Sequence, residues 1–99
     1  SDAPLARSAA KDRLNWCLDE GTVIYTKHFR EELVNDGFSM EDVLFVCRSG
    51  TILMAPEQDT QVGALEVQIE GKTLDMRGAA IVFALRPQQA VLITVFERK

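Results

Sequence analysis

The spacing of apolar residues changes near Thr51, and this change limits the fold more than any other feature of the sequence. Before Thr51, apolar residues recur at helical intervals, as at Leu14, Cys17 and Leu18. After it, apolar and polar residues alternate along 64–70, which is typical of a strand with one buried face. The sequence therefore predicts an α+β fold in which N-terminal helices pack on a C-terminal antiparallel sheet of about four strands.

The boundaries of the predicted elements come from the residues that start and stop helices and strands. Helices are expected over 4–20, 27–35 and 40–48, the last opened by a capping box between Ser39 and Asp42. Strands are expected over 22–26, 51–55, 64–70, 73–86 and 90–96, with a polar connection over 56–63 and a turn over 70–72. The longest strand is expected to bulge or bend at Arg77 and Gly78.

Length and composition predict one domain over 1–99, with residues 1–4 a tag remnant or disordered. The apolar fraction of 46% and the charged fraction of 26% are typical of a folded domain. No apolar run approaches the roughly 20 residues that a membrane helix needs. The N-terminus lacks the basic and apolar regions of a signal peptide, so we expect a cytoplasmic protein.

Cysteine and charge counts narrow the possible chemistry. Cys17 and Cys47 lie within helix-like apolar patterns, so we expect two buried thiols rather than a disulfide. With one histidine and no paired-ligand spacing, no metal site and no cofactor are expected. The net charge is −4, and acids outnumber bases by nine to six in residues 1–50 and by six to five in 51–99. This balance argues against tight, non-specific binding of nucleic acid.

The last two predicted strands are apolar on both faces. Ala80, Val82 and Ala84 alternate with apolar neighbours, and the strand over 90–96 shows the same pattern. An antiparallel sheet normally keeps one polar face. Either helices cover both faces, or one face is buried against another chain. We expect a homodimer or a tightly bound partner.

Several short stretches, taken in order, resemble a known family. They are 23–30, where a strand runs into a helix that opens with His28, then 37–43, 49–52, 69–74 and 91–96. Together they are similar, over about 20–97, to the domain-of-unknown-function family 4258, which is grouped with the RelE-like toxin ribonucleases near the BrnT branch. The layout also resembles the MqsR toxins, although Glu97 stands where those have a lysine. The resemblance implies a bacterial toxin that cleaves mRNA, or has lost that activity, with an antitoxin and an RNA substrate as partners.

Metal-independent RNA cleavage needs a group that deprotonates the ribose 2′-hydroxyl and cations that stabilise the charge on the phosphate. His28 has the suitable unperturbed pKa, and Arg77 and Arg30 are candidate phosphate clamps, so these three are the predicted catalytic residues. The predicted RNA-binding residues are Tyr25, which can stack on a base, and Arg86, Arg98 and Lys99. This mechanism requires a hollow between helices and sheet that is lined by both His28 and Arg77.

The residues leave other interpretations open. His28 can instead be structural, bonded to backbone or to a nearby carboxylate such as Glu31, and Arg77 can be a solvated strand residue. The whole domain can be a non-catalytic interaction module that dimerises or binds a partner through its apolar sheet face. A third interpretation is a small-molecule binder with its pocket between helices and sheet.

Overall fold

The computed structural model describes residues 3–59 and 64–99, and its architecture is α+β as predicted. The helices in this part are α1 (Ala3–Asp19), α2 (Lys27–Asn35) and α3 (Met40–Ser49). The strands are β1 (Thr22–Tyr25), β2 (Thr51–Ile52), β3 (Glu57–Asp59), β4 (Ala64–Lys72), β5 (Gly78–Arg86) and β6 (Gln89–Glu97). Residues 1–2, part of the predicted tag or disordered segment, lie outside the described residues, whereas Ala3 and Pro4 belong to α1.

The sheet is mixed and has more strands than predicted. Its order is β1-β6-β5-β4-β2, and β3 also pairs with β4. β1 runs parallel to β6, while the other pairs are antiparallel. The antiparallel pairing predicted for strands joined by short turns is confirmed for β4, β5 and β6, but the sheet is not antiparallel throughout. β1 instead pairs with the last strand of the chain. β2 is shorter than the predicted strand 51–55, and β3 falls within the predicted connection.

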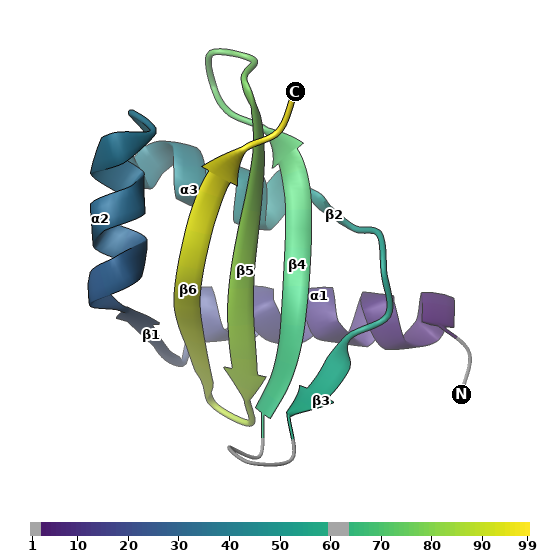
Figure 1. Cartoon of the computed structure of the whole chain (residues 1–99). Helices are drawn as coiled ribbons and strands as arrows, with labels where there is room; N and C mark the ends of the chain where they lie inside the picture. Colours follow the sequence, from purple (N-terminus) through teal and green to yellow (C-terminus); the bar gives the residue numbers. More distant parts are fainter. Residues whose placement is uncertain (1–2, 60–63) are drawn as a thin grey trace.

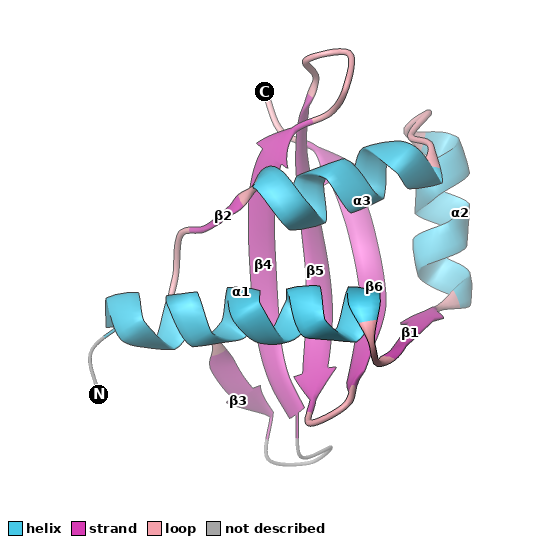
Figure 2. Cartoon of the chain, turned by 180° about the vertical axis from the view of Figure 1, so that it is seen from behind, coloured by secondary structure: helices cyan, strands magenta, loops and turns pink. Residues whose placement is uncertain are grey.

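Two helices cover one face of the sheet. Figure 2 shows α1 and α3 lying across the same side of β4, β5 and β6. Figure 1, seen from the opposite side, shows those three strands with no helix of the described chain in front of them. The core between helices and sheet consists of apolar side chains from both layers: Leu14, Cys17, Val43, Val46, Cys47, Val67, Ile69, Ile81, Phe83, Leu85, Leu92 and Val95. Cys17 and Cys47 are free and buried, which confirms the prediction of two thiols.

Thr26 fixes the start of α2 and holds this helix against β6. Its hydroxyl accepts a hydrogen bond from the backbone N–H of Phe29 at 3.1 Å, which caps the helix. The same hydroxyl donates to the carbonyl oxygens of Leu92 at 3.0 Å and Ile93 at 3.2 Å. Since β1 ends at Tyr25, α2 continues along the edge of β6 where β1 stops (Figure 1).

The predicted capping box at the start of α3 is confirmed. Ser39 Oγ accepts a hydrogen bond from the backbone N–H of Asp42 at 3.1 Å, and the Ser39 N–H donates to Asp42 Oδ2 at 2.9 Å. The hydrogen bond from the Ser39 N–H is the main cause that lowers the pKa of the Asp42 carboxyl, against an opposing effect of burial. The Ser39 side chain, the backbone N–H of Leu74 and the charge of Arg77 lower this pKa further. The start of α3 therefore lies beside the loop between β4 and β5.

The predicted turn at 70–72 is wrong, because β4 continues through Lys72. Gly71 is needed for packing instead of for a turn. A Cβ atom at Gly71 would lie 3.0 Å from the Cα of Gly50, which follows α3. A Cβ atom at Gly50 would lie 2.8 Å from the carbonyl oxygen of Glu70. The two glycines let the end of α3 contact the backbone of β4. Gly71, from which the turn was predicted, therefore marks a close approach of two backbones.

The turn lies instead between Thr73 and Arg77. The Thr73 N–H donates to the carbonyl oxygen of Arg77 at 2.8 Å, and the Arg77 N–H donates to the Thr73 hydroxyl at 3.0 Å. That hydroxyl in turn donates to the carboxylate of Asp75. Met76 adopts a left-handed conformation with φ of 67°. The predicted long strand therefore begins only at Gly78, and a turn that ends at Arg77 stands where a bulge or bend was predicted.

The irregularity of the sheet lies between β5 and β6. Their register shifts between Val82 and Phe83, which leaves Ile93 as the extra residue of β6. Because of this extra residue, Leu92 and Val95 both belong to the core although they are three positions apart. The strict alternation predicted for the last strand therefore does not hold.

Candidate functional site

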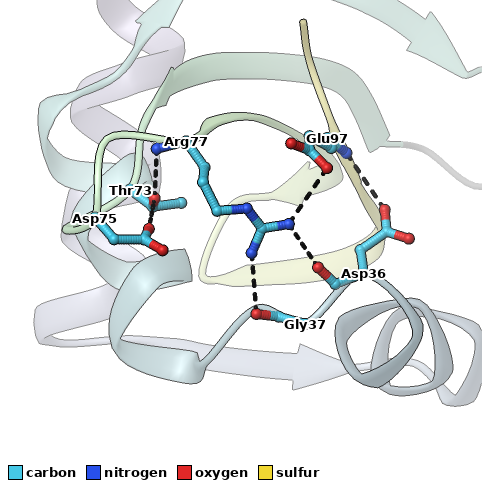
Figure 3. Close-up of polar contacts among 6 residues, drawn as sticks. All are labelled: Asp36, Gly37, Thr73, Asp75, Arg77 and Glu97. Carbon is cyan, nitrogen blue, oxygen red and sulfur yellow. Dashed lines mark hydrogen bonds and ion pairs between the residues drawn. The ribbon is translucent and has the colours of Figure 1, made fainter.

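Arg77, one of the predicted catalytic residues, lies at the centre of polar contacts that join the β4–β5 loop, the end of α2 and the end of β6 (Figure 3). Its Nη1 donates to the carbonyl oxygen of Gly37 at 3.1 Å, and its Nη2 donates to that of Asp36 at 2.6 Å. Nη2 also lies 3.4 Å from Glu97 Oε1. The guanidinium carbon is 4.3 Å from the centre of the Phe38 ring. Arg77 therefore caps α2 and cross-links three segments.

The surroundings of Arg77 already balance its charge. The two carbonyl oxygens lie at the negative end of the α2 dipole, and the Glu97 carboxylate adds a full negative charge. Glu97 is itself held in place, because its backbone N–H donates to Asp36 Oδ2 at 3.3 Å. Glu97 thus provides a carboxylate that faces Arg77. A phosphate would have to share the guanidinium with these contacts, so the geometry favours a structural role for this side chain.

His28 lies at the opposite end of α2 from the groups that Arg77 contacts. It is exposed in the first turn, directly after the cap at Thr26. From His28 to Asp36 the helix advances by about 12 Å at 1.5 Å per residue. The expectation of one hollow lined by His28 and Arg77 is therefore wrong. The β4–β5 loop folds onto the C-terminal end of α2, whereas His28 belongs to the N-terminal end.

The remaining candidates near His28 do not converge on it either. Arg30 is exposed two residues further along α2, and side chains two apart on a helix do not face each other. Tyr25 is half-buried, and its ring centre lies 6.0 Å from that of the core residue Phe29. The tyrosine therefore packs against the core.

The predicted RNA-binding cations lie at both ends of the sheet. Arg86 is the last residue of β5, while the backbone N–H of Arg98 donates to Gly78 at the start of the same strand at 2.9 Å. A strand of this length spans about 26 Å at 3.3 Å per residue. The Arg98 side chain forms an ion pair with Glu70 at 3.0 Å, and the exposed Lys99 follows it. These residues form no common surface with Arg86.

We call the sheet face that α1 and α3 leave uncovered the outer face. It consists of the strand side chains that alternate with the core positions: Thr22, Ile24, Thr51, Glu57, Glu66, Gln68, Glu70, Lys72, Ala80, Val82, Ala84, Arg86, Gln89, Val91, Thr94 and Phe96. Its strands β4, β5 and β6 face the viewer in Figure 1. Ala84 of β5 pairs with Val91 of β6, which pairs with Ile24 of β1. This produces an apolar row across three strands, and Ile24 is 41% exposed.

Side chains cover one end of the outer face, whereas its middle is partly accessible. Glu70 of β4 and Arg98 after β6 form an ion pair, with β5 lying between their strands. Ala80, the residue of β5 that pairs with Glu70, is fully buried. Val82 and Ala84, further along β5, are only partly buried. The accessible apolar surface is therefore centred on the part of β5 that follows the ion pair.

One border of the outer face is acidic. Glu57 of β3 stands directly opposite Glu66 of β4, and both side chains are exposed. Among the described residues, no ion pair involves either carboxylate. Like charges directly opposite each other destabilise a strand pair. Both glutamates line a shallow pocket of about 240 Å³, together with Met54 and Val82.

The comparison with protein families gives a match over most of the chain. The model of the family described as domain of unknown function (DUF4258) matches residues 25–97. The chain belongs to this family. The match runs from the end of β1 to the end of β6, so it includes the Arg77 cluster and nearly all of the outer face of the DUF4258 domain. No match was found among curated proteins or among solved structures.

The described residues of the DUF4258 domain offer little for metal binding, thiol chemistry or membrane insertion by a helix. They contain no group of three or more histidine, cysteine, aspartate or glutamate side chains placed to hold a metal ion. Neither do they include a helix with the length and apolar character needed to cross a bilayer. Burial raises the pKa of Cys47 to about 12, so this side chain stays a protonated thiol near neutral pH.

Sequence reasoning missed several residues that shape this domain. Thr73 and Asp75 form the turn that places Arg77, and an aspartate two residues after a threonine is a turn signal that could have been recognised. The pairing of Glu57 with Glu66 could not have been found, because β3 has no apolar alternation that marks it as a strand.

Proposed function

We propose that this DUF4258 domain is a protein-interaction module that binds a partner protein through the outer face of its sheet. The observation that carries the proposal is the row of Ala84, Val91 and Ile24, which crosses three strands without a described helix over it. Water-covered faces of antiparallel sheets normally carry polar side chains. Adjoining apolar side chains on an otherwise complete fold indicate a protein contact.

The supporting contacts make this surface rigid. β5 pairs along its whole length with β4 and β6, and β6 is held at its edge by β1 and by the Thr26 hydroxyl. A binding surface built on paired strands loses little conformational entropy when a partner binds. In contrast, the predicted catalytic residues are spread over both ends of α2, so the geometry supports an interaction module better than a nuclease.

A double variant tests the proposal. Val82→Gln with Val91→Gln removes apolar surface from the outer face without adding charge. Val34→Gln with Leu44→Gln is the matched control, since these residues are exposed on α2 and α3. A partner captured from the cells that make the protein is identified, purified and titrated by calorimetry against each variant, after circular dichroism has shown that both are folded. We expect at least tenfold weaker binding for the outer-face variant and unchanged binding for the control. Equal binding by all three proteins would contradict the proposal.

The expected homodimer is tested with the same proteins. Light scattering over a range of concentrations gives the mass of the wild type and of the outer-face variant. A dimer that dissociates only in the Val82→Gln, Val91→Gln variant would identify the partner as a second copy of this chain. A monomer at every concentration would exclude that partner.

A second candidate is the metal-independent ribonuclease that the family resemblance implies, with an antitoxin as its partner. Such a nuclease would have to act without Arg77, and the observation that favours it is the exposure of His28 in the first turn of α2, where the helix dipole also attracts phosphate. His28 would take the proton of a ribose 2′-hydroxyl, whose oxygen would attack phosphorus and expel the 5′-oxygen, which takes a proton from water. Purified wild type and His28→Ala are compared on RNA. Equal decay in both samples, or none in either, removes this candidate.

A further inference from the structure

We infer that the partner bound by the outer face is a protein segment with apolar side chains at one end and a lysine or arginine at the other. The inference rests on the proposed function and adds the chemistry of the partner. It follows from one row of paired residues that crosses five strands and changes from acidic to apolar: Glu57, Glu66, Ala84, Val91 and Ile24.

Among the described residues, no cation forms an ion pair with the acidic end of the row, and Arg86, two residues after Ala84 on the same face of β5, donates to Gln89 instead. Neighbouring side chains of paired strands have Cβ atoms about 5 Å apart, so the carboxylates of Glu57 and Glu66 repel each other. Glu70, on the same face of β4, is neutralised by Arg98 at 3.0 Å. The described residues supply no such ion pair to the other two carboxylates. A cation from a partner would relieve the repulsion and would bring opposite charges together at the edge of the interface.

The surface beside these carboxylates suits the long side chain of lysine or arginine. The pocket of about 240 Å³ has Met54 and Val82 in its wall next to the two glutamates. Met54 is 77% exposed although it is apolar. The methylene groups of a lysine or arginine can pack on such apolar atoms while the charged end reaches the carboxylates.

The strand spacing sets the separation between the charged and apolar parts of the partner. Ile24 lies three strands away from Glu66 in the row, which is about 14 Å at 4.8 Å per strand. A helix covers this distance in about nine or ten residues. We therefore expect a helical partner segment with its cation about ten residues from its last apolar contact.

The charge of this surface disfavours the other possible occupants. A nucleic acid would bring phosphates against Glu57 and Glu66, where binding instead needs cations. A second copy of this chain would bring another molecule with a net charge of −4. A basic segment of a different protein fits the acidic border better than either.

Titration of the full ¹⁵N-labelled chain with three synthetic helical peptides of equal length tests the inference. The first peptide has leucines and a pair of lysines about ten residues apart on one face, the second replaces the lysines with glutamates, and the third replaces the leucines with serines. We expect the first peptide to shift the amide signals of Val82, Ala84 and Val91 and to bind at least tenfold more tightly than the other two. For the Glu57→Gln, Glu66→Gln variant, the first peptide should bind less than threefold more tightly than the second. Glu31→Gln with Glu32→Gln on α2 is the matched control and should leave the advantage unchanged.

The other outcomes separate failure of the inference from failure of the proposed function. Equal binding of both leucine peptides at the outer face would overturn the requirement for a cation and leave the interaction module in place. Tight binding of the serine peptide, or of an RNA oligonucleotide, at these signals would overturn the apolar requirement. If none of the peptides shifts the amide signals of the outer face, both the further inference and the proposed interaction module are overturned.

Discussion

Replacing Arg77 with alanine should destabilise the fold by about 2–4 kcal/mol, since the change removes every contact that the guanidinium makes. Its two hydrogen bonds to the carbonyl oxygens of Asp36 and Gly37 contribute about 1 kcal/mol or more each. Stacking on Phe38 adds about 0.5–1 kcal/mol. The ion pair with Glu97 adds at most about 1 kcal/mol, because that side chain is 39% exposed and water screens the pair.

Urea unfolding followed by circular dichroism measures this loss, and thermal unfolding should show a fall in Tm of at least about 8 °C for a domain of this size. Arg86→Ala is the matched control. Arg86 also lies at an end of β5 but contacts only the side chain of Gln89, at 3.3 Å, among the described hydrogen bonds. Its replacement should cost less than about 0.5 kcal/mol. Arg77→Lys keeps the charge but not the planar group that reaches two carbonyl oxygens, so it should fall between alanine and the wild type.

Equal stability losses for Arg77→Ala and Arg86→Ala would refute this reasoning. The guanidinium would then be free of the contacts assigned to it, and a role in binding phosphate would again be open. A large loss of stability in Arg77→Ala, with little change in Arg86→Ala, would agree with the position of Arg77 as the link between α2 and the β4–β5 loop.

Three further predictions concern single contacts. Thr26→Ala should cost about 1–2 kcal/mol in urea unfolding, because it removes the cap of α2 and its bonds to β6, whereas Thr26→Ser should stay close to the wild type; equal losses for both would contradict this. Gly50→Ala should cost about 1–3 kcal/mol, because the added Cβ would lie 2.5 Å from the carbonyl oxygen of Val46 and 2.8 Å from that of Glu70, and an unchanged urea midpoint would show that these close approaches are not formed. The lowered pKa of Asp42 means that its carboxylate stabilises the fold above its unfolded-state pKa of about 3.9 and that this contribution disappears as the pH falls through the lower folded-state value. The stability difference between wild type and Asp42→Asn should therefore be largest above about pH 5 and shrink towards pH 3, and a difference independent of pH would refute the assignment.

Local signals in the sequence predicted the helices well, because caps act within a few residues. α2 was predicted from Lys27 to Asn35, with Thr26 before it and Gly37 after it, and these are its bounds in the structure. The turn at 70–72 was predicted wrongly because Gly71 serves a contact with Gly50, twenty-one positions earlier in the chain. A glycine that lets two backbones approach and a glycine that makes a turn cannot be distinguished from local sequence.

The pairing of distant strands explains which parts of the candidate site could be predicted. The second apolar face of β5, at Val82 and Ala84, was visible as a pattern within one strand. The acidic border could not be predicted, because Glu57 lies opposite Glu66 only when β3 pairs with β4, and β3 has no pattern of its own that marks it as a strand. The separation of His28 from Arg77 likewise depends on where the β4–β5 loop packs, which the sequence does not encode locally.

The most direct test of the outer face as a binding surface is photo-crosslinking in the cells that make the protein. A photoreactive side chain at position 91 lies at the centre of the apolar row, and one at position 44, on α3, serves as the control. We expect a single crosslinked partner protein from position 91 and none from position 44. Adducts that form equally at both positions, or at position 44 alone, would contradict the assignment of the outer face as the functional surface.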